Sequence, residues 1–169
     1  MLGCFLVRKY RRKTIRVMIT ETEAYRGEDD LASHASRGRT PRTEVMYGEP
    51  GHAYVYIIYG MYFCLNVVTE KKDYPAAVLI RGVAVGDSIS NWRSNLHIDG
   101  PGKLCRFLKI DKKLNQWDLT RGEKLWIASP RMVRLGRKKL NLKIIKSKRI
   151  GVDYAKHCKK YLWRFYLKT

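Results

Sequence analysis

The stretch from Ala53 to Asn66, AYVYIIYGMYFCLN, constrains the fold more than any other part of the chain. It is as apolar as a protein core, yet it contains four tyrosines and, near its middle, Gly60. Aromatic and β-branched residues on both sides of a turn residue are typical of two antiparallel strands joined as a hairpin. The stretch therefore predicts a β-hairpin with Tyr59 and Met61 at its tip.

The length of the hairpin loop decides which side chains share a face. A two-residue loop centred on Tyr59 and Gly60 would put the even-numbered residues of the two strands on opposite faces. A three-residue loop containing Gly60 would instead put Asn66 on the same face as Tyr56. With either loop the tip is hydrophobic, which suggests docking or wedging against a partner. The alternative is a loosely packed surface tyrosine.

The other periodic segments predict an α+β fold. Short helices are expected over residues 27–37, over 40–48 with Thr40 as N-cap, and over the Gly-rich start of 100–110. We expect a single compact domain, residues 1–169, on a curved, largely antiparallel β-sheet with surrounding short helices and a protruding β-hairpin. Its further strands are predicted at residues 5–10, 13–25, 76–85, 124–129, 142–150 and 163–168.

Two glutamates lie in an unusual place in the second of these strands. Glu21 and Glu23 have the same parity as Ile15, Val17 and Ile19, so a regular strand would point them inward with the apolar residues. A buried carboxylate is costly unless it is paired or used. Either Glu23 forms a structural ion pair, for which Arg81 is the candidate, or it has a chemical role.

The net charge of +20, from 35 Lys and Arg against 15 Asp and Glu, indicates an anionic partner, most commonly nucleic acid. A ribosome-like or merely basic protein is the alternative. The four cysteines are scattered and have no metal-ligand spacing, which fits a reducing compartment. No apolar run approaches the length of a membrane span, so a soluble, intracellular protein is expected.

Six sequence blocks, in order, resemble the alkyladenine (3-methyladenine) DNA glycosylase family. The resemblance extends from Leu2 to Lys168, and the segment that usually precedes the first strand in this family is short or absent. The blocks are ITETEAYRGEDDLASH, SRGRTPRTEVMY, PGHAYVYIIYGMYFCLNVVT, AAVLIRG, GPGKLC and RIGVDYA…WRFY.

This resemblance implies a monofunctional DNA glycosylase of base excision repair, without metal, cofactor or AP lyase activity. Such an enzyme flips alkylated or deaminated purines, of the 3-methyladenine and hypoxanthine type, out of double-stranded DNA and hydrolyses the N-glycosidic bond. The family implies a monomer. It would work in the nucleoid-associated cytoplasm of a bacterium or in the nucleus of a eukaryote.

The resemblance also implies roles for individual residues. Glu23 matches the general base that activates water, and Arg81, with the backbone near Ile150, matches the position that holds this glutamate and its water. Asn66 matches a residue that excludes the exocyclic amino group of guanine, and Tyr59 matches the intercalating tyrosine. Tyr25, His34 and Tyr56 match the base pocket, and positions near the DNA backbone are matched by Arg42, Met46, Met61, Tyr62, Gly102 and Lys103.

Other classes fit the sequence less well. It lacks the H-x-E…P-C-x-x-C signature of zinc deaminases and the closely spaced cysteines of iron–sulfur glycosylases. A non-catalytic DNA- or RNA-binding protein on the same fold is the remaining alternative. Mere binding would need neither Glu23 nor the pocket residues, so their presence together favours the enzyme.

Overall fold

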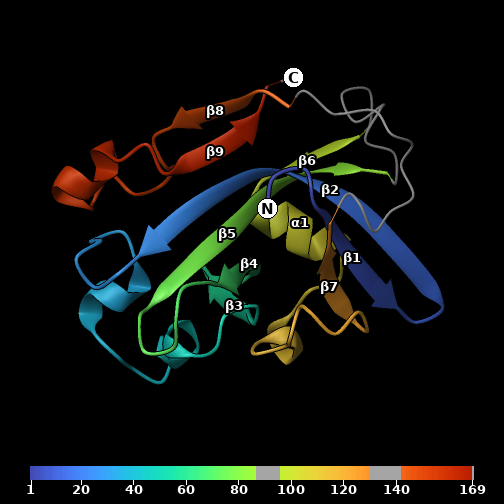
Figure 1. Ribbon diagram of the computed structural model, residues 1–169, viewed down its shortest axis with the longest axis horizontal. Coiled ribbons are helices and arrows are strands. Elements are labelled where there is room, and N and C mark those ends of the chain that lie inside the picture. Colours follow the sequence, from blue (N-terminus) through green and yellow to red (C-terminus); the bar gives the residue numbers. More distant parts are fainter. Residues whose placement is uncertain (87–95, 130–141, 169) are drawn as a thin grey trace.

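The sheet is built around β2 (Lys13–Arg26), a strand of 14 residues. In the computed structural model, which describes residues 1–86, 96–129 and 142–168, β2 pairs antiparallel with β1 (Phe5–Tyr10), β5 (Ala76–Val85) and β9 (Arg164–Leu167). Figure 1 shows β2 and β5 running side by side across the molecule. The strands predicted at residues 5–10, 13–25, 76–85 and 163–168 are confirmed.

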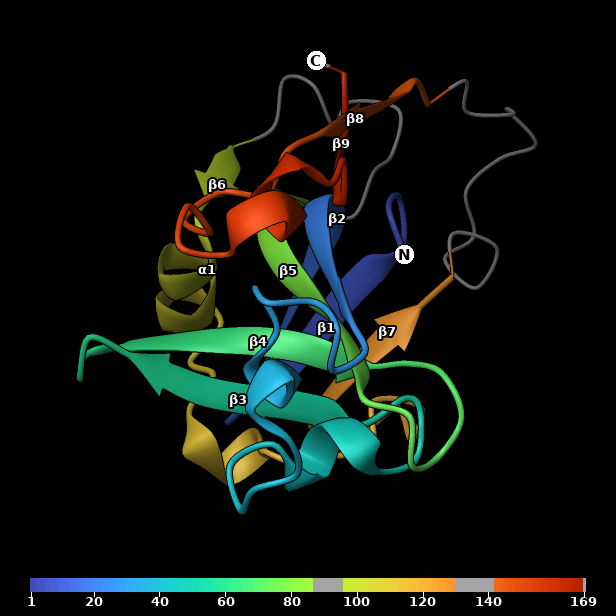
Figure 2. The ribbon, with the colours of Figure 1, turned by 90° about the vertical axis from the view of Figure 1, so that its left-hand side faces the viewer.

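Further strands extend and curl this sheet (Figures 1 and 2). Its order is β3-β4-β5-β2-β1-β7, with β6 added to β5 and β8 added to β9. Every strand pair among the described residues is antiparallel, so the predicted α+β fold on a curved antiparallel sheet is confirmed. Of these strands, the sequence did not predict β6. Their bounds are β3 (Ala53–Ile58), β4 (Tyr62–Val68), β6 (His97–Asp99), β7 (Leu125–Ala128) and β8 (Ile144–Ser147).

The main hydrophobic core lies between the curled sheet and α1 (Pro101–Phe107). α1 confirms the predicted helix, and its first residue is a proline, which suits a first turn because no amide hydrogen is needed there. None of the helices among the described residues is long and apolar enough to cross a membrane. Core side chains come from every layer and include Leu6, Val17, Ile19, Leu65, Ile80, Val83, Leu104 and Leu108.

β2 does not run as the regular strand that its parity suggests. Its register against β5 shifts between Ile19 and Glu21 and again between Glu21 and Thr22. Every residue from Val17 to Glu23 is buried, so the alternation of exposed and buried side chains stops there. Glu21 and Glu23 are both inside, as expected. The irregular part of the strand therefore lies at the two glutamates. Such bulges are often found beside functional sites.

The two segments before the hairpin contain 3-10 helices at their ends and not the longer helices predicted from the sequence. The first is η1 (His34–Arg37) and the second is η2 (Glu44–Tyr47). Thr40 is not the N-cap: its amide donates to Thr43 Oγ1 at 2.8 Å, and Thr43 precedes the second helix. Local bonds of this kind compete with the helical pattern. The predicted stop at Gly48 is confirmed.

The hairpin has the three-residue loop. Ile58 pairs with Tyr62, which leaves Tyr59, Gly60 and Met61 as the turn. Even positions pair with even, so Asn66 shares a face with Tyr56, but it lies opposite Tyr54, two residue pairs further from the tip. The hairpin projects from the molecule at the left of Figure 2. Its tip is strained, because Tyr59 has a φ of 51°, in the left-handed region that disfavours large side chains.

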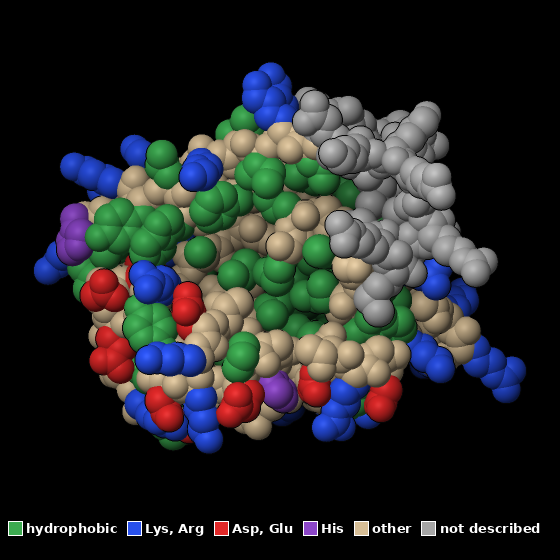
Figure 3. Space-filling model, in the orientation of Figure 1, with side chains coloured by type: hydrophobic (Ala, Val, Ile, Leu, Met, Phe, Trp, Pro, Cys, Tyr) green, Lys and Arg blue, Asp and Glu red, His purple; other side chains and the backbone are tan. Residues whose placement is uncertain are grey.

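The face seen in Figure 3 lies away from the hairpin tip. Hydrophobic side chains gather in a hollow near its middle, and Lys and Arg side chains stand around its margin. A cavity of about 290 Å³ is lined there by residues from the N-terminus, β2, β5, β8 and β9, namely Met1, Leu2, Thr22, Ala24, Val78, Ile144 and Phe165.

Truncating the core should cost far more stability than truncating the hairpin. Ile80 is fully buried in the main core, so Ile80→Ala should lower the free energy of unfolding by about 2–5 kcal/mol. Ile57→Ala makes the same change on a hairpin side chain that is 44% exposed, and should change stability by about 0.5 kcal/mol or less. Urea denaturation measures both. Equal losses of stability would contradict the placement of Ile80 in the core and of Ile57 at the surface.

Candidate active site

A cavity of about 540 Å³ opens where β2, β5, the β3–β4 hairpin and the segment from Ile150 to Tyr154 meet. Its size is typical of small-molecule sites. Met61, Tyr62, Gly102 and Lys103 are not among its lining residues. The other residues predicted from the sequence all line it: Glu23, Tyr25, His34, Arg42, Met46, Tyr56, Tyr59, Asn66 and Arg81.

Glu23 is fully buried at the wall of this cavity, and both of its carboxylate oxygens accept hydrogen bonds. The Ile150 backbone N–H donates to Oε1 at 2.8 Å, and the Tyr25 hydroxyl donates to Oε2 at 2.9 Å. Arg81 Nε lies 3.7 Å from Oε1. The three groups come from three separate chain segments: β2, β5 and residues 148–155, the strap that lies between β8 and η5 (Lys156–Lys160). The carboxylate therefore joins the strap to the sheet.

These contacts set the protonation of Glu23. Burial raises the pKa of its carboxyl above the ordinary value, because the charged form loses its hydration. The hydrogen bond from Ile150, the Arg81 charge and the hydroxyl of Tyr25 lower this pKa again, since each favours the carboxylate. The outcome is a carboxylate that binds a proton more readily than a surface glutamate.

Arg81 has a closer partner than the one expected. Its Nε donates to Glu21 Oε1 at 3.0 Å, and Arg164 Nε donates to the same oxygen at 2.5 Å. Two arginines therefore hold Glu21 in place, and through this contact Arg81 is held beside Glu23. The sequence did not indicate Arg164, which lies on β9 and reaches Glu21 only because β9 pairs with β2.

Aromatic rings form another part of the cavity wall. The His34 and Tyr56 rings meet edge to face at 4.6 Å, and the Tyr54 and Tyr56 rings lie 5.2 Å apart. His34 Nδ1 and the Tyr54 hydroxyl are hydrogen-bonded at 2.9 Å. Tyr54 was not predicted as a site residue, although its parity with Tyr56 is the signal that could have found it.

His34 is uncharged at neutral pH. Burial, together with the charges of Arg42 and Arg37, lowers its pKa to about 4. Arg42 lies over the Tyr56 ring, 5.5 Å from its centre. A neutral imidazole beside two phenols makes this part of the cavity suitable for a flat, uncharged or cationic ring system.

Asn66 is buried on β4, where its Nδ2 donates to the Tyr54 carbonyl at 3.1 Å. This bond fixes the amide at the cavity wall. Met46 is also almost fully buried, at 2% exposed, so it lines the cavity and leaves little surface for a DNA backbone.

The cavity mouth carries exposed apolar side chains on two sides. On the hairpin side Tyr59 is 86% exposed, and Met61 and Tyr62 are exposed beside it. Across the mouth lie Ile150 and Tyr154, which are also exposed. Tyr154 had no distinctive signal in the sequence, because its position depends on how the strap folds back over β2.

Gly102 and Lys103 are the last two residues for which the sequence predicted a position near a DNA backbone. A Cβ on Gly102 would lie 3.0 Å from the Tyr62 side chain, so the lack of a side chain lets α1 pack closely against the hairpin. Lys103, the next residue, is exposed.

Comparison with known proteins identifies the family of the chain. The family model described as methylpurine-DNA glycosylase matches residues 1–169. The chain belongs to the methylpurine-DNA glycosylase family. The resemblance inferred from the sequence blocks is thereby confirmed, and with it an enzyme class that removes alkylated bases from DNA.

Relatives in this family cover nearly all of the chain. A protein of Methanocella arvoryzae is 46% identical over 177 residues, which span 100% of this chain and 84% of the relative. A protein of Desulfitobacterium hafniense is 43% identical over 183 residues, which span 99% of this chain and 86% of the relative. Both are provisionally named 3-methyladenine DNA glycosylase.

The raised pKa of Glu23 predicts that the site costs stability. Because the pKa of Glu23 is higher in the folded than in the unfolded protein, the protonated carboxyl favours the folded state. That stabilisation is lost as the pH rises through the folded-state pKa and the group ionises. At pH 7, therefore, Glu23→Gln should raise the melting temperature, by about 2–4 °C for each kcal/mol gained. The gain should shrink as the pH is lowered through the pKa of Glu23.

Glu44→Gln is the matched control for this melting experiment. Glu44 is exposed, and its hydrogen bond with Arg39 lowers its pKa. Removing that carboxylate should leave the melting temperature unchanged or lower it. A lower melting temperature for Glu23→Gln at pH 7 would contradict the predicted cost.

Proposed function

We propose that the protein is a monofunctional DNA glycosylase of base excision repair that flips an alkylated or deaminated purine out of duplex DNA and hydrolyses its N-glycosidic bond. The observation that carries the proposal is the fully buried Glu23 carboxylate, held by two hydrogen bonds at the wall of an aromatic-lined cavity. The names of the relatives make 3-methyladenine the first substrate to test. Hypoxanthine, a deaminated purine, is the second.

In the proposed reaction Glu23 is the general base. It takes a proton from a water molecule as the water oxygen bonds to C1′ of the sugar, and the C1′–N bond breaks with its electron pair leaving on the purine. The sugar passes through an oxocarbenium-like state, which the same carboxylate stabilises by its charge. Arg81, fixed by Glu21, favours the ionised form of Glu23. The mechanism forms no covalent enzyme intermediate, so no AP lyase activity is proposed.

The choice of substrate follows from what the cavity lacks. Glu23 is the one carboxylate among the described residues that line it, so no second acid is at hand to protonate a departing base. Alkylated purines, which are already cationic, leave without one. Tyr25, His34 and Tyr56 would hold such a base by stacking, for which aromatic contacts contribute about 1–3 kcal/mol per base.

His34 would contribute a directed hydrogen bond. Arg42 lies within hydrogen-bonding reach of the Tyr54 hydroxyl, which leaves that hydroxyl to donate its own proton to His34 Nδ1. A neutral His34 then carries its proton on Nε2. That N–H can donate to a purine acceptor, such as the O6 of hypoxanthine. Asn66, held by the Tyr54 carbonyl, would collide with the 2-amino group of guanine.

The DNA would lie against the hairpin side of the cavity mouth. Tyr59, exposed at a strained tip, is the wedge that would enter the base stack as the purine leaves. The backbone contacts proposed for this face are Arg42, Met61, Tyr62, Gly102 and Lys103. A monomer would suffice for this reaction, and it would work inside the cell, where its DNA substrate is.

A non-catalytic protein that binds DNA or RNA remains the competing proposal. The charge of +20 and the exposed hairpin would serve it equally well. It gives no reason for a buried carboxylate with a raised pKa, because binding a polyanion gains nothing from that charge. Activity separates the two.

The test is single-turnover excision from a duplex containing 3-methyladenine or hypoxanthine. Wild-type protein should release the base, and Glu23→Gln should be slower by a factor on the order of 10² to 10⁴. Binding of the variant to the damaged duplex should persist, which excludes misfolding. Release at the wild-type rate by Glu23→Gln would reject Glu23 as the base, and no release by wild-type protein from either duplex would favour the binding protein.

The wedge has its own test. Tyr59→Ala leaves Glu23 and the aromatic part of the cavity wall intact but removes the plug at the mouth, so excision of hypoxanthine should fall most when the base is stably paired and is costly to extrude. The loss should be smaller when hypoxanthine is mismatched. Met61→Ala, at the same tip and 65% exposed, is the matched control and should have the smaller effect. Equal losses on paired and mismatched duplexes would reduce Tyr59 to a surface contact.

A further inference from the structure

Arg149 and Asp30 form a fully buried ion pair beside the cavity, and neither was predicted from the sequence. Arg149 Nη1 donates to Asp30 Oδ2 at 2.5 Å, and Nη2 donates to Asp30 Oδ1 at 2.7 Å. Both side chains have no exposed surface. Asp30 also accepts from the Ala32 amide at 3.1 Å, so the loop after β2 is tied to the strap that carries Ile150.

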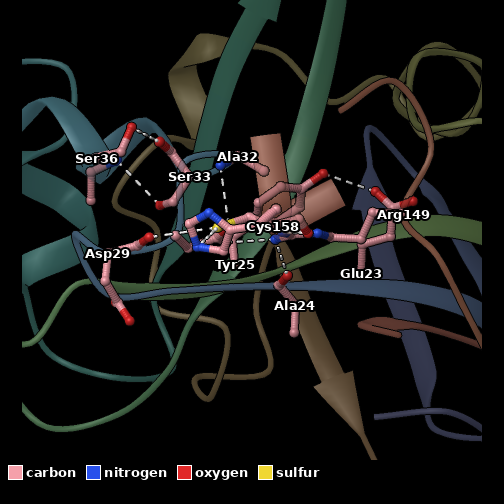
Figure 4. Close-up of polar contacts among 12 residues, drawn as sticks. Glu23, Ala24, Tyr25, Asp29, Ala32, Ser33, Ser36, Arg149 and Cys158 are labelled. Atoms are coloured by element: carbon pink, nitrogen blue, oxygen red, sulfur yellow. Dashed lines mark hydrogen bonds and ion pairs between the residues drawn. The ribbon is translucent and has the colours of Figure 1, made fainter. Parts of the chain in front are cut away.

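Arg149 also grips the strand next to Glu23. Its Nη1 donates to the Ala24 carbonyl at 2.9 Å, and its guanidinium lies 4.8 Å from the centre of the Tyr25 ring and 5.1 Å from that of Trp163. The Ala24 amide in turn donates to the Trp163 carbonyl at 2.8 Å. Figure 4 shows Arg149 next to Ala24 and Tyr25, with the Tyr25 hydroxyl directed to Glu23.

The two groups that donate to Glu23 are thus both neighbours of Arg149. Ile150, whose amide donates to Oε1, is the next residue in the chain. Tyr25, whose hydroxyl donates to Oε2, has its ring against the guanidinium. One side chain therefore restrains both hydrogen bonds that the carboxylate receives.

Stability alone does not account for this arrangement. A buried ion pair loses so much hydration that well-packed apolar side chains in its place are often as stable or more stable. Arg149 Nε, moreover, is buried and has no hydrogen-bond partner among the residues that the structure describes, which adds a further cost. What the planar guanidinium supplies, and apolar packing would not, is fixed direction: two hydrogen bonds to Asp30, one each to the carbonyls of Ala24 and Cys158, and a flat face on Tyr25.

We propose that Arg149, oriented by Asp30, is a positioning residue for the reaction, because it sets the directions from which Ile150 and Tyr25 donate to Glu23. The inference rests on the proposed function, in which Glu23 is the base. Arg149 touches neither the substrate nor the water. It acts through the strap and through the Tyr25 ring.

Loosening these two hydrogen bonds should raise the pKa of the Glu23 carboxyl. Hydrogen bonds to a carboxylate favour its charged form, so weakening them raises its pKa, and the fraction able to act as base at a given pH falls. The other charges around Glu23 are Arg81 on β5, Glu21 on β2 and Arg164 on β9, and none of them contacts Asp30. They remain in place when the pair is changed. The charge of Arg149 also acts on Glu23 directly. In Asp30→Asn that charge is left without its partner and would by itself lower the pKa of Glu23, so a rise in this variant reports the loosened hydrogen bonds.

The experiment is the paired variant Asp30→Asn/Arg149→Met, which removes one charge of each sign and leaves an acceptor for the Ala32 amide. Its single-turnover excision at the high-pH plateau should fall about 10- to 100-fold. The acid limb of its pH–rate profile should move to higher pH. Asp30→Asn alone, a milder change that is isosteric, should move the limb in the same direction by less, and serves if the paired variant does not fold.

A second readout does not need activity. In protein labelled with carbon-13 glutamate, the carboxyl resonance of Glu23, identified by its absence in Glu23→Gln, should titrate at higher pH in both variants than in wild-type protein. Tyr25→Phe, which removes one of the two hydrogen bonds directly, gives the size of shift to compare. Leu125→Ala, buried in the main core away from the cavity, should lower stability without moving the titration.

The possible outcomes distinguish a failure of this inference from a failure of the proposed function. If neither the acid limb nor the Glu23 resonance moves in Asp30→Asn or in the paired variant, Arg149 and Asp30 are structural and the inference is wrong, while excision by wild-type protein keeps the proposed function. If the resonance moves but wild-type protein excises nothing, the positioning stands and the proposed reaction fails. A shift in Leu125→Ala equal to that in the paired variant would also overturn the inference, because general loosening would then explain it.

Discussion

The structure depends on one electrostatic constraint, a carboxylate buried in the middle strand of its sheet. Such a charge is tolerable only if donors converge on it from fixed directions. For Glu23 the two donors are Tyr25 on β2 itself and the Ile150 amide on the strap before η5, and the charge of Arg81 on β5 lies beside them, so three distant parts of the chain must be in place together. The bulged register of β2 and the curl of the sheet bring them to one point.

Much of this could be predicted from the sequence because the signals were local. Alternation and turn residues located eight of the nine strands among the residues that the structure describes, and the Gly-rich start of residues 100–110 located α1. The odd carboxylate in a run of Ile and Val drew attention to Glu23, and the even positions of the hairpin put Tyr56 and Asn66 on one face, while the roles of all three came from the resemblance to the family. Each of these signals needs a window of only a few residues, and the structure places all three residues at one cavity.

What could not be predicted depends on long-range pairing. Arg149 and Asp30 are 119 residues apart, and Arg164 and Glu21 are 143 apart, so no local pattern links either pair. β6, with three residues, is too short to show alternation. The helices expected before the hairpin shrink to single 3-10 turns because Asp30, Ser33 and Thr43 bond to nearby backbone amides.

The three-residue loop of the hairpin has a consequence for how this protein can change over time. Side chains alternate along β4, so adding or deleting a single residue at the tip would turn the strand inside out relative to β3. Asn66 would then point away from the cavity, and an adjacent side chain of β4 that now packs in the core would point into it. Changes of length at the tip are therefore admissible in steps of two, whereas changes of residue identity there keep the pairing of the strands and are limited by the left-handed backbone at Tyr59 and Gly60 and by the need for a wedge.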